Sequence, residues 1–286
     1  ILPSMLLTGS EYLPDVVAGE VLASVAWRED GIGLDPLTSR ARVMLEAEAT
    51  LNGTKRFVVG AGAADALIVS ADGVDGLSLW WVPVGTQGVR ITEERLADGT
   101  FAGAVSLDDV RIPLTNRLGD GAALSQALDV ATILAAAELL AAARAAFEMT
   151  LEHLRTRKQF GAAIGSFQAL RHRAVDCGAQ LELARAVLTS AIAAGDPAER
   201  AILASRAKAR CGDAAWLIAR EGIQMFGAMG FTDELDLSLY VKRILVLSAS
   251  LGAAHDHRRR FTALCPPVEE TGQGRGAITP ALRDLP

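Results

Sequence analysis

The sequence predicts an α+β protein, with an antiparallel β-domain followed by a C-terminal four-helix bundle. Its first half consists of short β-branched or aromatic runs separated by Gly- and Asp-rich turns. After about residue 118, apolar residues recur at intervals of 3 and 4, which is typical of amphipathic helices. Because no helical pattern separates the strand runs, an antiparallel sandwich or small barrel is favoured over a Rossmann fold.

Composition excludes several classes of protein. The 286 residues are 50% hydrophobic, which excludes disorder and suffices for about two domains. The net charge is −6, so a nucleic acid is not the expected principal partner. Charges interrupt every apolar run before about 18 residues, so we expect no membrane span, and no signal-peptide pattern is found.

The 3 cysteines are far apart and odd in number. Cys177, Cys211 and Cys265 are therefore interpreted as buried thiols in a reducing compartment, with neither a disulfide framework nor a zinc site. This pattern predicts a cytoplasmic location.

Residues 21–117 are assigned to the β-domain. Strand-like runs occupy residues 56–59, 66–69 and 77–82. The glycines of residues 60–62 do not open a helix, so a hairpin turn is favoured over a phosphate-binding loop. Of the adjacent Trp80 and Trp81, we expect one in the core and one on the surface.

Residues 118–264 are assigned to the bundle. The second expected helix has a continuous apolar stripe, which consists of Phe167, Leu170, Ala174, Cys177, Leu181, Ala184, Leu188 and Ile192. Asp196, Pro197 and Glu199 resemble a helix N-cap with its first turn, and the helix they begin is expected to end near Gly227. Residues 124–147 are apolar on nearly every side, which predicts a central helix. Residues 265–286 are rich in Gly, Pro and charge and are assigned to a tail.

General motifs do not identify a function. His255 and His257, followed by three arginines, are better explained as a solvated helix end than as a metal or anion site. No Ser–His–Asp arrangement is apparent, and no metal site is expected.

Two segments resemble a known family. Residues 157–161 (RKQFG), followed by Phe167 and Gln168, resemble the Arg-x-x-Phe-Gly…Phe-Gln signature of acyl-CoA dehydrogenases. Residues 222–231 (GIQMFGAMGF) are similar to the Gln-x-x-Gly-Gly-x-Gly turn of that family. The resemblance covers nearly the whole chain to about Phe261.

The resemblance implies an N-terminal helical domain, a β-domain and a four-helix bundle, usually assembled as a tetramer. From the resemblance we expect the first domain to be largely absent from this chain, with residues 1–20 as its remnant. Family members use a carboxylate to remove the α-proton of an acyl-CoA thioester, and the β-hydride passes to FAD. The resemblance implies that the bundle contacts the pyrophosphate and adenine of an FAD shared with a partner subunit, through Arg157, Gln159, Phe160, Gln168, Gln224, Phe226 and Gly227. The alternative is that these are inherited packing residues.

The flavin-ring side departs from the family pattern. Arg28 replaces a small hydroxyl residue, Leu34 replaces a serine, and Phe57 and Val59 stand for an aromatic residue and a threonine beside the ring. We therefore expect that this β-domain does not hold an isoalloxazine ring.

The resemblance implies two positions for the catalytic base of the family, and neither holds a carboxylate in this sequence. They hold Leu251 and Ala131, so no catalytic residue is assigned. Glu138 lies two helical turns from Ala131 on the same face, where it is a weak candidate for a substitute base or makes a buried or inter-helix polar contact. Asp129 is expected to be solvated.

Three hypotheses follow. In the first, the chain is the non-catalytic subunit of a heterotetrameric (α2β2) acyl-CoA dehydrogenase, an oxidoreductase of lipid metabolism. A steroid side-chain CoA thioester is the candidate substrate. The chain's partners are then a base-bearing subunit, the acyl-CoA and an electron-transferring flavoprotein. The second is a self-sufficient homotetrameric dehydrogenase with Glu138 as base, and the third is a redox-inactive assembly scaffold.

Overall fold

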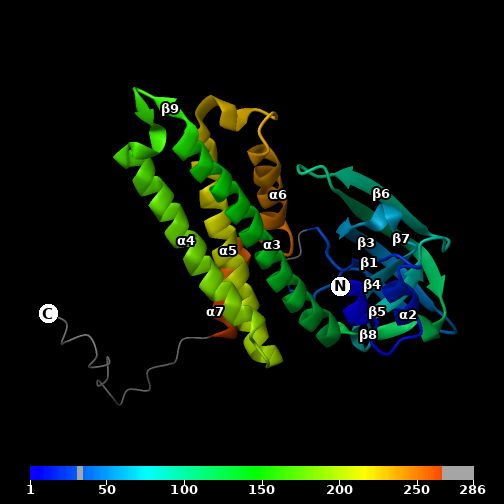
Figure 1. The fold of residues 1–286 in the computed structure, drawn as a ribbon. Coiled ribbons are helices and arrows are strands. Elements are labelled where there is room, and N and C mark those ends of the chain that lie inside the picture. Colours follow the sequence, from blue (N-terminus) through cyan, green and yellow to red (C-terminus); the bar gives the residue numbers. More distant parts are fainter. Residues whose placement is uncertain (31–34, 266–286) are drawn as a thin grey trace, which may run out of the picture.

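A mainly antiparallel sheet and a bundle of long helices lie side by side in the computed structural model, which describes residues 1–30 and 35–265 (Figure 1). The predicted tail lies outside the described residues except for Cys265, and so does the expected departure at Leu34. Before the first strand the described chain forms two short helices, α1 (Leu2–Leu6) and α2 (Leu13–Ala18).

The sheet has 8 strands in the order β6-β7-β3-β2-β4-β5-β8, with β1 added along β4. Their bounds are β1 (Ala23–Ala26), β2 (Arg42–Leu45), β3 (Ala49–Val59), β4 (Ala66–Gly73), β5 (Gly76–Pro83), β6 (Val89–Arg95), β7 (Phe101–Ile112) and β8 (Arg117–Asp120). The long ladders are antiparallel, as predicted, whereas β1 pairs with β4 in parallel.

The turn after β3 is not a hairpin, contrary to the prediction. Gly60 adopts a left-handed conformation with φ 73° and leads into the 3-10 turn η1 (Ala61–Ala63). This turn connects β3 to β4, but β2 lies between those two strands in the sheet. The local turn residues therefore predicted that the chain turns after β3, but they did not predict which strand lies next to β3 in the sheet.

Both faces of the sheet are covered at β5. Trp80 packs into the core on one face, and Trp81 packs on the other face against the N-terminal helices and the start of the bundle. Both rings are buried, at 1% and 6% exposure, and Tyr12 stacks on Trp81 with ring centroids 4.4 Å apart. The expectation of one surface tryptophan was wrong because α1, α2 and the first helix of the bundle cover that face.

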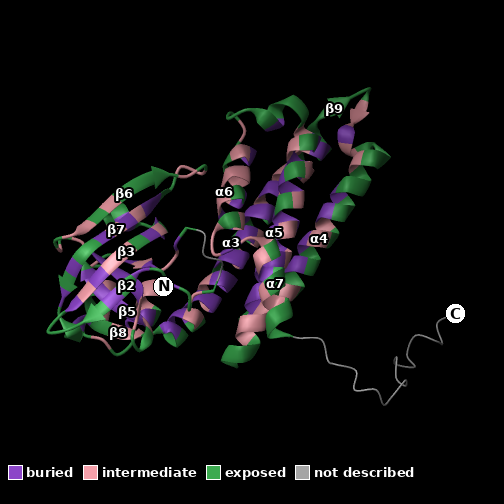
Figure 2. Ribbon diagram, turned by 180° about the vertical axis from the view of Figure 1, so that it is seen from behind, coloured by how far each residue is buried: buried purple, intermediate pink, exposed green. Residues whose placement is uncertain are grey.

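The bundle is formed by α3 (Gly121–Thr156), α4 (Gln168–Ile192), α5 (Pro197–Phe226) and α6 (Leu237–Ala249), with a further helix α7 (Ala254–Leu264) packed on α5. Buried faces of the helices meet inside the bundle (Figure 2). The Asp196 carboxylate accepts a hydrogen bond from the Glu199 backbone N–H at 2.9 Å, which confirms the predicted cap of α5. That helix ends at Gly227, which has φ 67°.

Buried alanines dominate the bundle core, together with Cys177 and Cys211. Since aromatic residues are scarce, the buried apolar surface of the bundle comes from helices packed closely around small side chains. The third cysteine, Cys265, is exposed because it follows the last turn of α7, contrary to the prediction.

Two stretches, Gly121–Thr156 and Leu237–Leu264, are long and apolar enough to cross a membrane by length and composition alone. The first is α3, which packs against α4, α5 and α6. The second comprises α6 and α7, which are separated by a turn. The absence of a membrane span stays a prediction.

Candidate functional site

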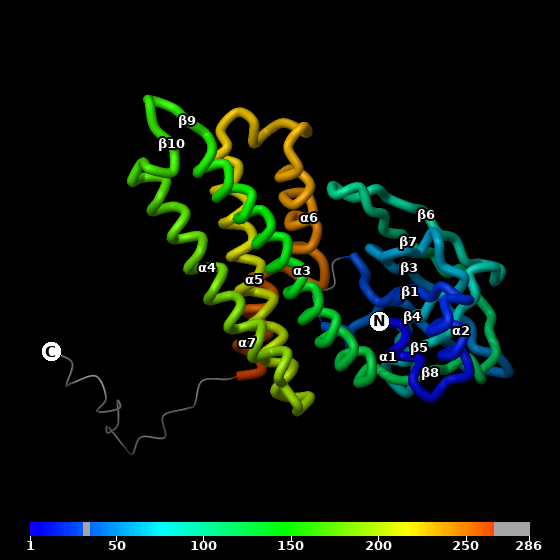
Figure 3. The backbone as a smooth tube through the Cα atoms, viewed as in Figure 1, coloured from blue at the N-terminus to red at the C-terminus, as the bar shows by residue number. Residues whose placement is uncertain are grey.

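The residues of the first family-like segment lie on a hairpin at one end of the bundle. There α3 is followed by the short strands β9 (Lys158–Gln159) and β10 (Ala162–Ala163). Phe160 and Gly161 form the tip, both with positive φ, 51° and 79°. This hairpin stands at the end of the bundle remote from the sheet (Figure 3).

Apolar packing fixes the base of this hairpin. The turn η3 (Ile164–Ser166) leads into α4, and the Ile164 N–H donates to the Arg157 carbonyl at 2.8 Å. Ile164 is buried in a cluster with Leu154 and Met225, which come from α3 and α5. The three helices therefore hold the hairpin in one orientation.

The second family-like segment joins the same end of the bundle. Phe226, at the end of α5, stacks on His153 of α3 with ring centroids 4.2 Å apart. Burial lowers the pKa of His153, and the positive charge of Arg157 lowers it further. After Gly227, the turn η4 (Gly227–Phe231) packs so tightly that a Cβ at Gly230 would lie 2.6 Å from the Ile223 carbonyl oxygen. The predicted cofactor residues thus share one end, and we call them the bundle-end cluster: Arg157, Gln159, Phe160, Gln168, Gln224, Phe226 and Gly227.

The polar side chains of the bundle-end cluster point into solvent and are not packed against the described part of the chain. Arg157, Gln159, Gln168 and Gln224 are exposed, and no side-chain hydrogen bond or ion pair of theirs is found within residues 1–30 and 35–265. Phe160 is 93% exposed and contacts Phe167 edge-on, with centroids 6.2 Å apart. A guanidinium, amides and an exposed aromatic face form a donor set suited to a phosphate and a planar base.

A second region lies between the sheet and α6. A cavity of about 540 Å³, here called the sheet–α6 cavity, opens between β1, β3, β7 and α6. Its lining is almost wholly apolar and consists of Leu2, Pro3, Ala23, Ser24, Val25, Trp27, Arg28, Phe57, Val59, Leu96, Ala97, Ala102, Leu245, Val246, Ala249, Ser250 and Leu251. Arg28 is the one charged residue among them.

A bulge in β3 shapes this cavity. The pairing of β3 with β7 shifts register between Lys55 and Val58, and Phe57 within the bulge has φ 56°. The Cζ atom of Arg28 lies 5.1 Å from the centroid of the Phe57 ring. The guanidinium therefore covers the aromatic face on which the resemblance would lay a flavin ring, so this sheet face does not fit the ring.

Beneath the bulge, Lys55 and Glu29 form a buried ion pair. The Lys55 Nζ lies 2.6 Å from the Glu29 Oε1, and the two side chains are 0% and 5% exposed. Burial opposes ionisation of Glu29, but hydrogen bonds from Lys55 and Ser39 outweigh it and hold its pKa below the usual range. Burial also lowers the pKa of Lys55. Both groups are satisfied internally, so they serve the fold.

Comparison with known proteins decides the family. Residues 119–262 match the family described as "Acyl-CoA dehydrogenase, C-terminal domain". The chain belongs to the acyl-CoA dehydrogenase family. It is 29% identical over 255 residues to acyl-CoA dehydrogenase IpdE2 of Mycolicibacterium smegmatis, with 89% of this chain and 75% of that protein covered.

Other relatives cover different shares of their own length. The bovine short/branched chain specific acyl-CoA dehydrogenase is 29% identical over 81% of this chain but only 56% of that enzyme. Among solved structures, a variant of the Tcur3481-Tcur3483 steroid acyl-CoA dehydrogenase has a TM-score of 0.83 and 28% identity, covering 92% of this chain and 74% of that one. A glutaryl-CoA dehydrogenase from Mycobacterium smegmatis in complex with FADH2 has a TM-score of 0.83 and 25% identity over 92% of this chain and 72% of that one.

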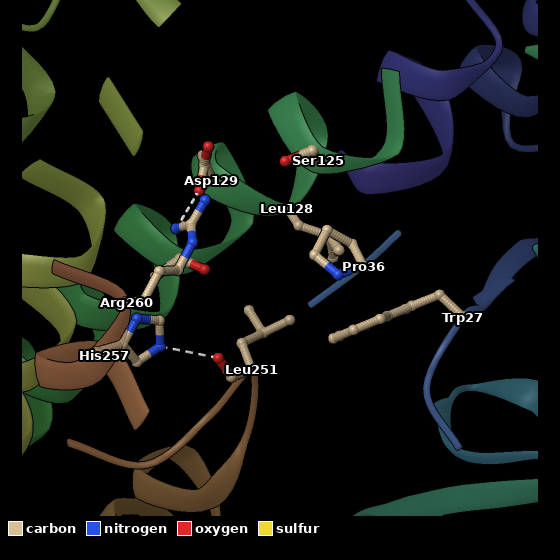
Figure 4. Close-up of a pocket in the computed structure, with 9 residues that line it drawn as sticks. Trp27, Pro36, Ser125, Leu128, Asp129, Leu251, His257 and Arg260 are labelled. Atoms are coloured by element: carbon tan, nitrogen blue, oxygen red, sulfur yellow. Dashed lines mark hydrogen bonds and ion pairs between the residues drawn. The ribbon is translucent and has the colours of Figure 1, made fainter. Parts of the chain in front are cut away.

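The two positions that the resemblance assigns to the family base, Leu251 and Ala131, stay predictions, and both side chains are apolar. Leu251 follows α6 with φ 54° and lines both the sheet–α6 cavity and a smaller one of about 20 Å³ (Figure 4). Ala131 lies on α3, partly buried. Glu138 lines neither of these two cavities. Its carboxylate lies 2.6 Å from Arg243, which also binds Asp98 at 2.7 Å. The inter-helix polar contact is therefore the alternative that the structure shows for Glu138.

Sequence reasoning missed a polar network beside the smaller cavity. Asp129 is 4% exposed and pairs with Arg260 of α7 at 2.6 Å, so the prediction of a solvated aspartate was wrong (Figure 4). His257 is 2% exposed and its Nε2 lies 2.9 Å from the Leu251 carbonyl oxygen. The inward face of α7 is thus buried, and the prediction of a solvated helix end holds only for its other face. The i, i+3 spacing of His257 and Arg260 was the signal that could have revealed this.

Proposed function

We propose that this chain is the non-catalytic subunit of a heteromeric acyl-CoA dehydrogenase, with a partner subunit that supplies the base. The observation that carries the proposal is the contrast between the two base positions and the bundle-end cluster. Leu251 and Ala131 cannot take a proton, whereas the bundle-end donors are exposed and unpaired in the described part of the chain. A chain that had lost every role in the reaction would have no reason to keep this set of donors together at one end of the bundle.

The lack of a carboxylate in the cavity supports this assignment. An α-C–H bond is a very weak acid, so proton removal needs a desolvated carboxylate within hydrogen-bond reach of the substrate. No lining residue of the sheet–α6 cavity is acidic, and Glu138 is half exposed and neutralised by Arg243. A self-sufficient enzyme with Glu138 as base is therefore the weaker alternative.

FAD, when bound, would accept the hydride from the acyl chain. The role we assign to this chain is to hold the other end of the cofactor: Arg157 would bind a pyrophosphate oxygen, and Gln168 and Gln224 would donate amide N–H groups. Ala131 and Arg157 are 26 positions apart along α3, which corresponds to roughly 39 Å at the helical rise. Because that separation exceeds an extended FAD molecule, the flavin ring would lie on the sheet of the partner subunit.

The names of relatives and structural neighbours support a proposal for the substrate and the remaining partners. The names of the bovine and Mycolicibacterium smegmatis relatives specify acyl-CoA, and one structural neighbour is named as a steroid enzyme. We therefore propose an acyl-CoA substrate, with a steroid side-chain thioester as the first candidate. An electron-transferring flavoprotein would receive the electrons, and the complex would work in the cytoplasm.

Separate and joint purification tests the proposal. The chain alone, a base-bearing family member encoded beside it, and the two expressed together would be assayed for acyl-CoA oxidation with a dye acceptor. We expect turnover only in the joint preparation, and its loss when the base of the companion is changed to an amide. Turnover by this chain alone would refute the proposal, and turnover by the companion alone at the same rate would favour the scaffold hypothesis.

A further inference from the structure

The sheet–α6 cavity combines an apolar wall with one positive charge. Its volume of about 540 Å³ lies within the roughly 300–1,000 Å³ typical of small-molecule sites. Val25, Val59 and Leu245 provide apolar surface from three different elements. Such a wall favours an apolar ligand, and the positive charge of Arg28 favours one that also carries a negative charge.

The Arg28 guanidinium is fixed in position but not neutralised. Its backbone carbonyl accepts a hydrogen bond from the Arg56 N–H at 2.8 Å, and its side chain lies over the Phe57 ring. The side chain makes one long hydrogen bond, 3.5 Å from Nη1 to the Ala249 carbonyl oxygen. No ion pair of Arg28 occurs in the part of the chain that the structure describes.

Arg56 provides the internal comparison. It approaches the same Phe57 ring at 5.4 Å, but its guanidinium pairs with Glu94 at 2.8 Å and with Asp30 at 3.4 Å. Of two arginines on one aromatic ring, the one outside the cavity is neutralised and the one lining it is not. The charge of Arg28 also acts on Lys208, whose pKa is lowered to about 8, mainly by burial and to a lesser extent by Arg28.

We propose that the sheet–α6 cavity binds an apolar carboxylic acid, with the carboxylate on Arg28 and the hydrocarbon body along the apolar wall. A carboxylate can accept two N–H groups of a guanidinium in parallel, and this pairing would satisfy the one charge that the wall leaves open. A neutral acyl group would bury the same apolar surface but leave that charge unpaired. The site is one of binding only, since the cavity holds no base, and it is independent of the FAD role of the bundle-end cluster.

Two probes that differ in charge test the proposal. Laurate and dodecanol share a twelve-carbon chain, and their affinities for the purified full chain would be measured by isothermal titration calorimetry at neutral pH, below the critical micelle concentration. We expect laurate to bind more tightly, and Arg28→Gln to weaken laurate binding by roughly tenfold to 100-fold, with about twofold or less change for dodecanol. Arg28→Lys keeps the charge and should retain part of the laurate affinity.

Matched variants locate the site. Ala249→Trp would fill the cavity from α6 and should weaken both probes, whereas Arg144→Gln removes an exposed charge on α3 and should change neither. Circular dichroism and the thermal midpoint would confirm that each variant is folded. Equal affinity for laurate and dodecanol, no laurate binding, or unchanged laurate affinity in folded Arg28→Gln would each overturn the proposal. Displacement of laurate by FAD at equal concentration would overturn it as well, because the cavity would then be a flavin site.

Discussion

The bundle-end cluster and the interior of the sheet differ in what satisfies their polar groups. At the bundle end, Arg157 and its neighbouring amides are exposed, and apolar residues beneath them carry the packing. Around the cavity, Glu29 and Lys55 are buried and satisfy each other, while Arg28 covers the ring of Phe57. The difference teaches that the bundle-end donors are left open to a partner outside the chain, whereas the buried carboxylate and ammonium of the sheet satisfy each other. Among the described residues Arg28 is the exception on the sheet side, since it lines the cavity without an ion pair.

The largest expected effect concerns the buried pair of the sheet. Glu29→Gln leaves the Lys55 ammonium buried without a counter-charge, so we expect a loss of about 3–5 kcal/mol in the free energy of unfolding. Urea denaturation followed by circular dichroism measures it. The double variant Glu29→Gln, Lys55→Met should recover part of the loss because no buried charge remains. A loss below about 1 kcal/mol in Glu29→Gln would show that the pair does not stabilise the fold. The statement that the buried polar groups of the sheet serve the fold would then be wrong.

The network beside Leu251 should make the protein sensitive to acid. Burial lowers the pKa of His257 to about 4 from 6.5, Lys208 and Arg260 act in the same direction, and the hydrogen bond to Leu251 and the charge of Asp256 oppose them. The unfolded chain therefore binds a proton between pH 6.5 and 4 that the folded chain does not. This contribution to stability is complete above pH 6.5 and is lost as the pH falls toward 4, by about 3 kcal/mol.

A variant isolates this contribution. His257→Gln should remove that part of the pH dependence, whereas His255→Gln, at an exposed position on the same helix, should keep it. Unfolding free energies at pH 7, 5.5 and 4 would be compared. An identical pH slope in the parent chain and His257→Gln would contradict the buried, neutral state of the histidine.

An intermediate effect is expected at the bundle end. Arg157→Ala should weaken FAD binding to the joint complex by about 10- to 100-fold, since a charge-assisted contact is lost, and Lys should restore only part of it. The thermal midpoint of the subunit should not move, because the side chain is exposed. Arg155→Ala, which removes an exposed arginine two residues earlier in the last turn of α3, is the control. Loss of fold with normal FAD affinity would make Arg157 a packing residue.

The smallest effect is expected at Glu138. Glu138→Gln removes a partly exposed ion pair with Arg243, which keeps its contact with Asp98, so we expect a change of at most about 1 kcal/mol in stability. Acyl-CoA turnover by the joint complex should be unchanged. Abolished turnover with FAD still bound would restore Glu138 as the base.

Sequence reasoning was strongest where the signal is local. The Asp196 cap, the end of α5 at Gly227 and the middle of the α4 stripe, residues 174–188, depend on residues a few positions apart, and all were predicted. The two ends of that stripe, Phe167 and Ile192, are exposed, contrary to the prediction. Trp81 was misjudged because the helices that cover it come from distant parts of the chain.

The same limit applies to the candidate site. The segments of the bundle-end cluster were identified by resemblance, and the structure brings them to one end of the bundle through the contact of His153 with Phe226. The partners of Asp129 and Glu138 lie on other helices, more than 100 positions along the chain, and no local pattern specifies them. The stacking of Arg28 on Phe57 likewise depends on the register shift in β3.

The FAD content of separately and jointly purified subunits tests the central claim most directly. FAD would be released by heat and quantified by absorbance against the amount of each chain. Our account predicts that this chain alone retains none, and that the joint complex retains FAD in proportion to its base-bearing subunit, reduced by Arg157→Ala. Stoichiometric FAD on this chain alone would contradict the account, because its own sheet would then hold the flavin ring.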